Sequence, residues 1–180
     1  KVEVIEQRSV GPSLGKDSIR LGVRAAIIGL LLVFIFMLLY YGWMGLLADI
    51  ALVCYALFTF ALMAALQATL TLPGIGAFIL SVGMAVDANV LIFERIKEEY
   101  RSGKTWRAAI QAGFDKAFKT ILDSNITTLI AAVLLFFIGT GSIKGFGVIL
   151  SLGILCSMFT GIWVTRALVD LLAPKPTFKS

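Results

Sequence analysis

Two polar side chains lie inside a long apolar stretch of this sequence. Asp87 and Asn89 fall within the run from Leu72 to Phe93, where Asp87 is the only charged residue. At about 1.5 Å per helical residue, this run is long enough to cross a hydrocarbon core of roughly 30 Å. An ionised Asp near the centre of a bilayer costs roughly 2.5–3.5 kcal/mol on insertion scales. We therefore expect Asp87 to respond to an ion or to be paired, and Asn89 to be a second ion-coupling residue that meets a different neighbour from its own side of the helix. For Asp87 the alternative is a protonated or hydrogen-bonded packing residue.

A second polar group opens a later apolar run. Its members are Asp123, Asn125, Thr127 and Thr128. In a helix, Asp123 shares a face with Thr127, and Asn125 shares a face with Thr128. We expect Asn125 and the two threonines to lie at a depth similar to that of Asp87, and the group to give an ion a polar route. For Asp123 the alternative is helix capping, because an Asp early in a helix accepts from free amides and suits the helix dipole.

The composition indicates an integral membrane protein. The 180 residues are 59% hydrophobic with a mean hydropathy of +0.95, whereas soluble domains average about 45–50%. There is no His, and Cys54 and Cys156 lie inside apolar runs without a Cys-x-x-Cys motif. We interpret both as packing residues and expect no metal site, no cofactor and no enzymatic activity. The net charge of +5 does not indicate nucleic-acid binding, because the positive residues collect in one loop.

The apolar segments predict an all-α membrane protein with five transmembrane helices. We expect them at 21–41, 44–66, 72–93, 121–138 and 143–172. The link between the third and fourth helices is long and the other links are a few residues each. Short links make the helices that they join antiparallel neighbours.

Residues 1–20 differ from the rest of the chain. Polar and apolar residues alternate from Lys1 to Val10, which predicts a strand. A turn is expected at Gly11–Gly15, and Asp17-Ser18 is a candidate N-cap for the first helix. Because one strand is not stable alone in water, we expect it to belong to a domain of which residues 1–20 are the end and the linker, or to pair with another chain. Residues 1–20 lack the short apolar core of a signal peptide.

The charged link at 94–119 predicts the orientation. It is rich in Lys and Arg, so the positive-inside rule places it in the cytoplasm together with the tail at 173–180. Residues 1–20 then lie outside. Apolar residues recur at helical spacing from Trp106 to Phe118, which predicts an amphipathic helix lying at the inner membrane surface. A solvated linker and a site for a cytoplasmic partner are the alternatives.

Small residues predict helix packing in two places. In the last predicted helix the four-residue series contains small residues with one large exception, Ile149: it runs Gly145, Ile149, Gly153, Ser157, Gly161 and Thr165. This pattern lets another helix approach closely. Gly83 lies one turn before Asp87 and leaves space for water, an ion or a neighbouring helix.

Several sequence blocks carry a family resemblance. They are Gly-Met-Ala-Val-Asp-Ala-Asn-Val-Leu-Ile at 83–92, Glu-Arg-Ile-Lys-Glu-Glu at 94–99, Asp-Ser-Asn-Ile-Thr-Thr-Leu-Ile at 123–130, Gly-Thr-Gly-Ser-Ile-Lys-Gly-Phe at 139–146 and Ser-Met-Phe-Thr at 157–160. Together they resemble the SecD/SecF family of bacterial protein-export membrane proteins, which is similar to resistance-nodulation-division transporters. Asp87-Ala88-Asn89 stands where the SecF branch typically reads Asn-Asp-Thr, so the resemblance is to the SecD branch.

The resemblance implies a fold, a location and partners. Residues 1–20 would be the end of the family's periplasmic domain and its linker. The five helices would be the second to sixth of a six-helix half that pairs with SecF in the bacterial inner membrane, with the N-terminal end periplasmic and the C-terminus cytoplasmic. The SecYEG channel, SecA, YajC-type accessory subunits, the preprotein and the lipid bilayer are the further partners implied.

The resemblance also implies an activity. The family uses the proton-motive force, or a sodium gradient, to assist late preprotein translocation on the periplasmic side. Asp87 matches the family's ion-coupling carboxylate, and a basic residue of SecF would face it. Two alternatives remain: an ion-coupled small-molecule efflux pump of the same superfamily, and a passive scaffold that holds translocon subunits together.

Overall fold

The structure, a computed structural model, describes residues 12–172 as a bundle of long helices. The elements are α1 (Pro12–Tyr41), α2 (Trp43–Ala65), α3 (Leu72–Arg101), α4 (Trp106–Ile138), α5 (Ser142–Phe159), the π-helical turn η1 (Thr160–Val164) and α6 (Thr165–Leu172). Five helical segments are long and apolar enough to span a membrane, with α5, η1 and α6 together forming the fifth. The predicted all-α fold with five membrane-length helices is confirmed.

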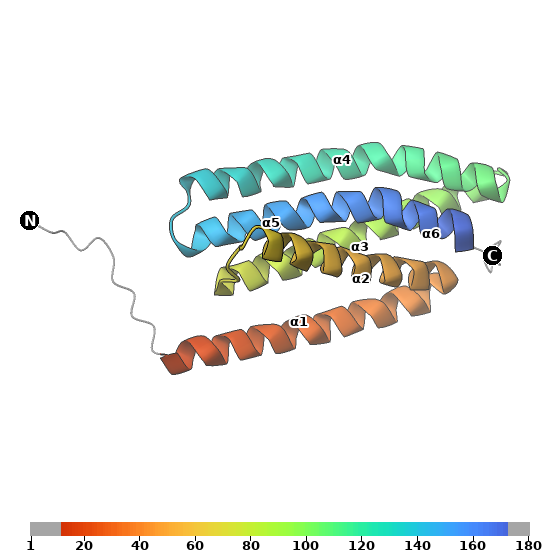
Figure 1. Cartoon of the computed structure of the whole chain (residues 1–180). Helices are drawn as coiled ribbons and strands as arrows, with labels where there is room; N and C mark the ends of the chain where they lie inside the picture. Colours follow the sequence, from red (N-terminus) through yellow and green to blue (C-terminus); the bar gives the residue numbers. More distant parts are fainter. Residues whose placement is uncertain (1–11, 173–180) are drawn as a thin grey trace, which may run out of the picture.

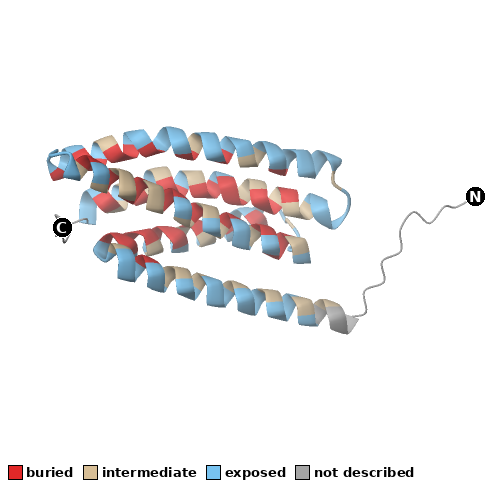
Figure 2. Cartoon of the chain, turned by 180° about the vertical axis from the view of Figure 1, so that it is seen from behind, coloured by how far each residue is buried: buried red, intermediate tan, exposed pale blue. Residues whose placement is uncertain are grey.

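The helices run side by side, with α1 and α4 on opposite sides of the bundle (Figure 1). Between them lie α2, α3 and the α5–α6 segment. Contacts among α3, α4 and α5 are the most extensive in the bundle, while α1 packs mainly on α2. Figure 2 shows that buried residues concentrate in the middle helices and that α1 and α4 are largely exposed. Their exposed side chains include Leu31, Phe36, Leu134 and Phe137, which suits helices that face lipid or another membrane chain.

The start of α1 corrects the prediction for the N-terminal segment. The helix begins at Pro12, so the turn expected at Gly11–Gly15 and the N-cap expected at Asp17-Ser18 are wrong, since residues 12–18 are helical. The physical reason is that proline is favoured in the first turn of a helix, where its missing N–H would have no partner. The predicted strand at Lys1–Val10 lies outside the described residues.

The predicted long link between the third and fourth helices is also corrected. Helix α3 continues to Arg101 and α4 already begins at Trp106, so only Ser102–Thr105 connects them. Gly103 adopts a φ of 95° in this link, a conformation that favours glycine. The predicted amphipathic helix is the first part of α4, and its apolar residues Trp106, Ile110 and Phe114 are buried in one cluster with apolar residues of α3. Its place at the membrane surface stays a prediction.

Close backbone contact explains this packing. A Cβ at Gly113 would lie 2.7 Å from the backbone nitrogen of Ile96, so only glycine lets α4 approach α3 this closely. At the same end of the bundle the buried carboxylate of Glu99 pairs with Lys104 at 2.5 Å and also with Lys116. These contacts extend the hairpin beyond the apolar part of α3, which ends at Phe93.

Candidate functional site

Asp87 lies on the exposed face of α3. It is exposed in this chain, as are Gly76, Leu80 and Gly83 on the preceding turns of the same face. A Cβ at Gly83 would meet no atom within 4 Å, so Gly83 contacts no neighbouring helix of this chain. These four residues form what we call the Asp87 face, a strip of the central helix that other described residues leave uncovered.

No described residue pairs with Asp87. Its carboxylate makes neither a hydrogen bond nor an ion pair within residues 12–172. The run from Leu72 to Phe93 contains no Lys or Arg. A carboxylate at this depth is costly unless it is neutralised or paired, so a second chain, an ion or a proton must complete its surroundings.

Asn89 has different surroundings although it is only two residues away. It is 3% exposed, and its side-chain oxygen accepts a hydrogen bond from the Thr165 hydroxyl at 2.8 Å. The same hydroxyl lies 3.2 Å from the backbone oxygen of Thr160. Residues two apart in a helix point to different sides, which explains why Asp87 faces outward while Asn89 faces α6. The structure therefore does not bring these two predicted site residues together.

The Asn89 contact holds a π-helical turn. Thr160 and Thr165 flank η1, and Thr160 donates to the backbone oxygen of Cys156 at 2.9 Å. Gly161 within this turn is buried, and a Cβ there would lie 3.7 Å from Ala88 of α3. Single π-turns are rare and occur frequently at functional sites. Sequence reasoning missed η1 and the role of Thr165 as the partner of Asn89.

The second predicted group lies on α4. Asn125 is buried at 7% exposure, whereas Asp123 and Thr127 are exposed. The Thr127 hydroxyl donates to the backbone oxygen of Asp123 at 2.9 Å, and Thr128 donates to that of Ser124 at 3.0 Å. Within residues 12–172, no hydrogen bond joins this group to Asp87. A polar route between them stays a prediction.

Two small residues of the last helical segment, Gly153 and Gly161, lie against α3. Gly153, Ser157 and Gly161 are all buried. A Cβ at Gly153 would lie 2.6 Å from the Cβ of Ser81 and 3.0 Å from the Tyr55 hydroxyl. Those two hydroxyl groups form a buried hydrogen bond of 2.6 Å between α2 and α3. Sequence reasoning missed this pair, because an isolated Tyr or Ser in an apolar run carries no periodic signal.

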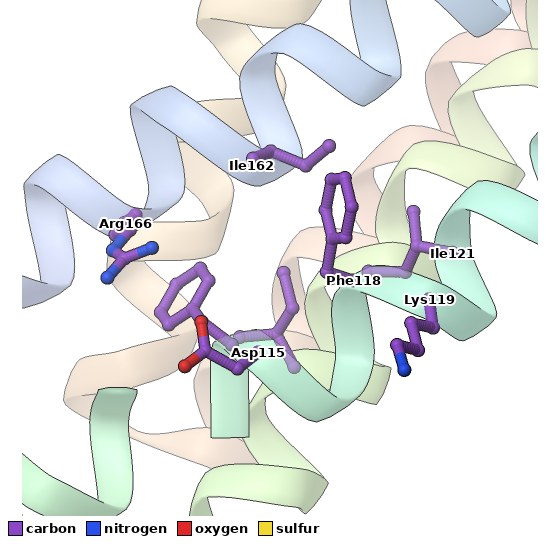
Figure 3. Close-up of a pocket in the computed structure, with 8 residues that line it drawn as sticks. Asp115, Phe118, Lys119, Ile121, Ile162 and Arg166 are labelled. Atoms are coloured by element: carbon purple, nitrogen blue, oxygen red, sulfur yellow. The ribbon is translucent and has the colours of Figure 1, made fainter. Parts of the chain in front are cut away.

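Two hollows open at the charged end of the bundle, beside the last helix. The smaller one, of about 140 Å³, lies between α4 and the η1–α6 segment, and its lining includes Asp115, Phe118 and Arg166 (Figure 3). Among the described residues, no group of three or more His, Cys, Asp or Glu side chains is arranged to bind a metal.

Comparisons with known proteins agree with one another. Residues 1–175 match the family Protein export membrane protein SecD/SecF, C-terminal. The chain is 59% identical over 172 residues to the Protein translocase subunit SecD of Acidaminococcus fermentans, covering 96% of this chain and 41% of that one. It is 53% identical over 178 residues to that of Dictyoglomus turgidum, covering 99% of this chain and 45% of that one. The chain thus spans less than half the length of these relatives.

A solved structure has the same fold. The crystal structure of SecDF, a translocon-associated membrane protein from Thermus thermophilus, superposes with a TM-score of 0.89 at 44% identity. The match covers 96% of this chain and 25% of that one.

Proposed function

The chain belongs to the SecD/SecF family of protein-export membrane proteins, and from this premise we propose that it is the membrane bundle of an ion-driven export subunit. It uses the proton-motive force, or a sodium gradient, to assist late preprotein translocation. In this proposal the bundle lies in the bacterial inner membrane, with its N-terminal end periplasmic and its C-terminus cytoplasmic. Its partners are SecF, the SecYEG channel, SecA, YajC-type subunits and the preprotein.

The observation that carries the proposal is the exposure of Asp87. An unpaired carboxylate on the outer surface of a membrane-spanning helix indicates that a group from outside this bundle pairs with Asp87 or neutralises it. A basic side chain from the SecF half, placed against Asp87, supplies the missing charge. The open space at Gly83 supports this arrangement, because small residues let a second helix or a water molecule come close.

The mechanism is physical rather than covalent. A proton or sodium ion that reaches Asp87 from the periplasmic side neutralises the carboxylate and weakens its attraction to the partner's cation. The two halves then repack, and release toward the cytoplasm follows the polar side chains of Asp123, Asn125, Thr127 and Thr128. One charge that crosses 100 mV yields about 2.3 kcal/mol. Since about 1.4 kcal/mol is a factor of ten, this biases a two-state packing by roughly fiftyfold.

Preprotein release from spheroplasts tests this function. Asp87→Asn in the full-length protein keeps the shape of the side chain and removes its charge. We expect assembly with SecF to be unchanged and release to fall to the level seen without an ion gradient. Asp17→Asn is the matched control, since Asp17 is an exposed carboxylate at the far end of α1.

The outcomes separate the alternatives. Normal release by Asp87→Asn would contradict ion coupling and favour a passive scaffold. Intact preprotein release with loss of drug resistance would favour a small-molecule efflux pump. If release falls as expected, repeating the assay with separate H⁺ and Na⁺ gradients identifies the ion.

A further inference from the structure

Helix α2 carries a single charged residue, Asp49, which the ion-coupling proposal does not use. At about 1.5 Å per residue, Asp49 lies roughly 9 Å along the helix from its start at Trp43. Its side chain is only partly exposed, and within residues 12–172 it forms no hydrogen bond or ion pair. A carboxylate inside a membrane-spanning helix is costly unless it is paired or neutralised. Asp49 therefore calls for a neutralising group of its own.

Asp49 lies at about the same level of the bundle as Asp87. Helices α2 and α3 are joined by a short link and run antiparallel, and the hydrogen bond between Tyr55 and Ser81 marks one common level (Figure 1). Asp49 precedes Tyr55 by six residues and Asp87 follows Ser81 by six, so both lie equally far from that bond toward the charged end. The described helices thus hold two carboxylates without a partner at one level.

The side chain of Asp49 lies on the face of α2 that packs on α1. It shares this face with Gly45, Leu52 and Ala56, at spacings of four, three and seven residues. Gly45 lies so close to the backbone oxygen of Met37 that a Cβ has no room. Leu52 and Ala56 belong to an apolar cluster to which α1 contributes Leu30, Val33 and Phe34. We call this contact between the two helices, with Asp49 in it, the α1–α2 seam.

The α1–α2 seam offers a metal cation no ligand except Asp49. Residues 25–39 of α1 have no side chain with an oxygen or nitrogen atom. Hard metal cations take several oxygen ligands, and the backbone oxygens of a helix are already used in its own hydrogen bonds. A proton needs only the carboxylate itself. The chemistry of the seam therefore favours a proton over a sodium ion.

The elements that contact α2 are α1, α3, the α5–η1 segment and α6. Their titratable groups in the half of the bundle near Asp49 include Tyr40 and Tyr41 of α1, Asp87 and Glu94 of α3, Cys156 of α5, and Arg166 and Asp170 of α6. Among the residues that the structure describes, none of these groups forms a hydrogen bond or ion pair with Asp49. Tyr41 donates to Glu94, and Arg166 lies beside Asp170. Asp49 thus has no countercharge within the described bundle.

We propose that Asp49 is a second proton-binding site, and that its proton controls the α1–α2 seam. With the proton bound, the neutral carboxyl group lies against the apolar face of α1 and the seam is closed. When the proton leaves for the solution at the charged end, the carboxylate must reach water, because burying an unpaired charge is costly. Helix α1 then moves away from α2 at this point. The inference rests on the membrane placement of the bundle and not on ion coupling through Asp87.

Carbodiimide labelling of the full-length protein in membranes tests proton binding. Dicyclohexylcarbodiimide partitions into bilayers and reacts with protonated carboxyl groups, whereas a water-soluble carbodiimide reaches carboxyl groups at the aqueous surface. Mass spectrometry of the digested protein locates each adduct. We expect Asp49 to react with the apolar reagent at mildly acidic pH and to lose this labelling as the pH rises and the carboxyl group gives up its proton. Asp17, an exposed carboxylate of α1, is the reference and should react only with the water-soluble reagent.

A cysteine probe in the seam tests the movement of α1. Val33→Cys places a thiol on the α1 side of the cluster, and a water-soluble maleimide measures its accessibility. We expect the maleimide to react several times faster at alkaline pH with this probe alone than with the same probe combined with Asp49→Asn, which cannot ionise. Comparing the same thiol in both proteins removes the effect of pH on the thiol itself. Combining the probe with Asp17→Asn is the matched control and should leave the fast reaction unchanged.

Four results would overturn the proposal. Labelling of Asp49 by the apolar reagent at every pH would show a permanently protonated packing residue, and labelling by the water-soluble reagent alone would show an ionised surface residue. Labelling by neither reagent would show that another chain covers Asp49. Equal reaction of the Val33→Cys probe with and without Asp49→Asn would show that the proton does not control the seam. None of these measurements uses preprotein release, so they remain decisive if the proposed function fails.

Discussion

At the scale of single residues, glycine positions differ in what surrounds them. Gly153 faces Ser81 and Tyr55 so closely that a methyl group has no room. Gly83 and Gly29 have nothing within 4 Å of the place where a Cβ would stand. Glycine therefore has two roles in this bundle. Gly153 allows close contact between helices of the chain, whereas Gly83 and Gly29 leave a helix surface uncovered.

Gly153→Ala should lower the stability of the protein. The added methyl would lie 2.6 Å from the Ser81 Cβ, so α5 must move away from α3, and overpacking of this kind typically costs about 1–3 kcal/mol. Thermal unfolding of the full-length protein in detergent measures the effect. Gly29→Ala on α1 is the matched control and should not destabilise, because Ala favours a helix over Gly by about 1 kcal/mol. Equal melting temperatures for the two variants would contradict the close contact.

At the scale of elements, the π-helical turn joins α6 to α3. Thr165 donates to Asn89 directly after η1, and Gly161 within the turn lies against Ala88. These contacts are on the buried side of α3, while Asp87 is on its exposed side. A shift of α3 caused by a change at Asp87 would therefore reach α6 through the Asn89 contact. The role of Asn89 in ion coupling stays a prediction, and this contact is the route by which Asn89 would link α3 to α6.

Thr165→Val tests the strength of this connection. Valine has nearly the shape of threonine but no hydroxyl, so the Asn89 oxygen loses its buried donor. Interhelical hydrogen bonds of this kind in membrane proteins are worth about 0.6–1.7 kcal/mol. We expect a lower melting temperature for Thr165→Val and none of that loss for Thr120→Val, which changes an exposed threonine of α4. A Thr165→Val protein as stable as the wild type would show that the contact does not stabilise η1.

The elements also show how far sequence reasoning extends. The five membrane helices were predictable because long apolar runs have few alternatives. The length of α4 was not, because its amphipathic first part and its apolar second part were predicted as two separate helices, and the contact at Gly113 that holds the first part on α3 is a tertiary feature. The π-turn was not predictable either, since Thr160–Val164 contains no residue pattern that specifies it. Asp87 was recognisable by type and depth, but its outward direction required the neighbouring helices.

At the scale of the whole molecule, two kinds of exposed surface can be distinguished. The exposed faces of α1 and α4 carry large apolar side chains such as Leu39 and Phe137, which suit contact with lipid chains. The Asp87 face carries two glycines and a carboxylate beside one large apolar side chain, Leu80. Small residues let helices pack closely in membranes, and intramembrane charges almost always face protein or a water-filled cavity. The Asp87 face therefore has the composition of a helix interface, and the partner half proposed above is expected to cover it.

Photo-crosslinking identifies what covers this surface. A benzoylphenylalanine placed at Leu80, which is 49% exposed on the Asp87 face, should crosslink to SecF in membranes of cells that express both proteins. The same probe at Leu155 of α5, which is 51% exposed, should give little of this product, because Leu155 lies outside the Asp87 face. Because the two positions are equally exposed, a difference in crosslinking reports which face of the bundle SecF covers and not how accessible each probe is. If Leu80 yields only lipid adducts while the complex is intact, the cation that faces Asp87 does not come from SecF. The carboxylate would then have to be neutral in the resting state, because no described residue of its own chain pairs with it.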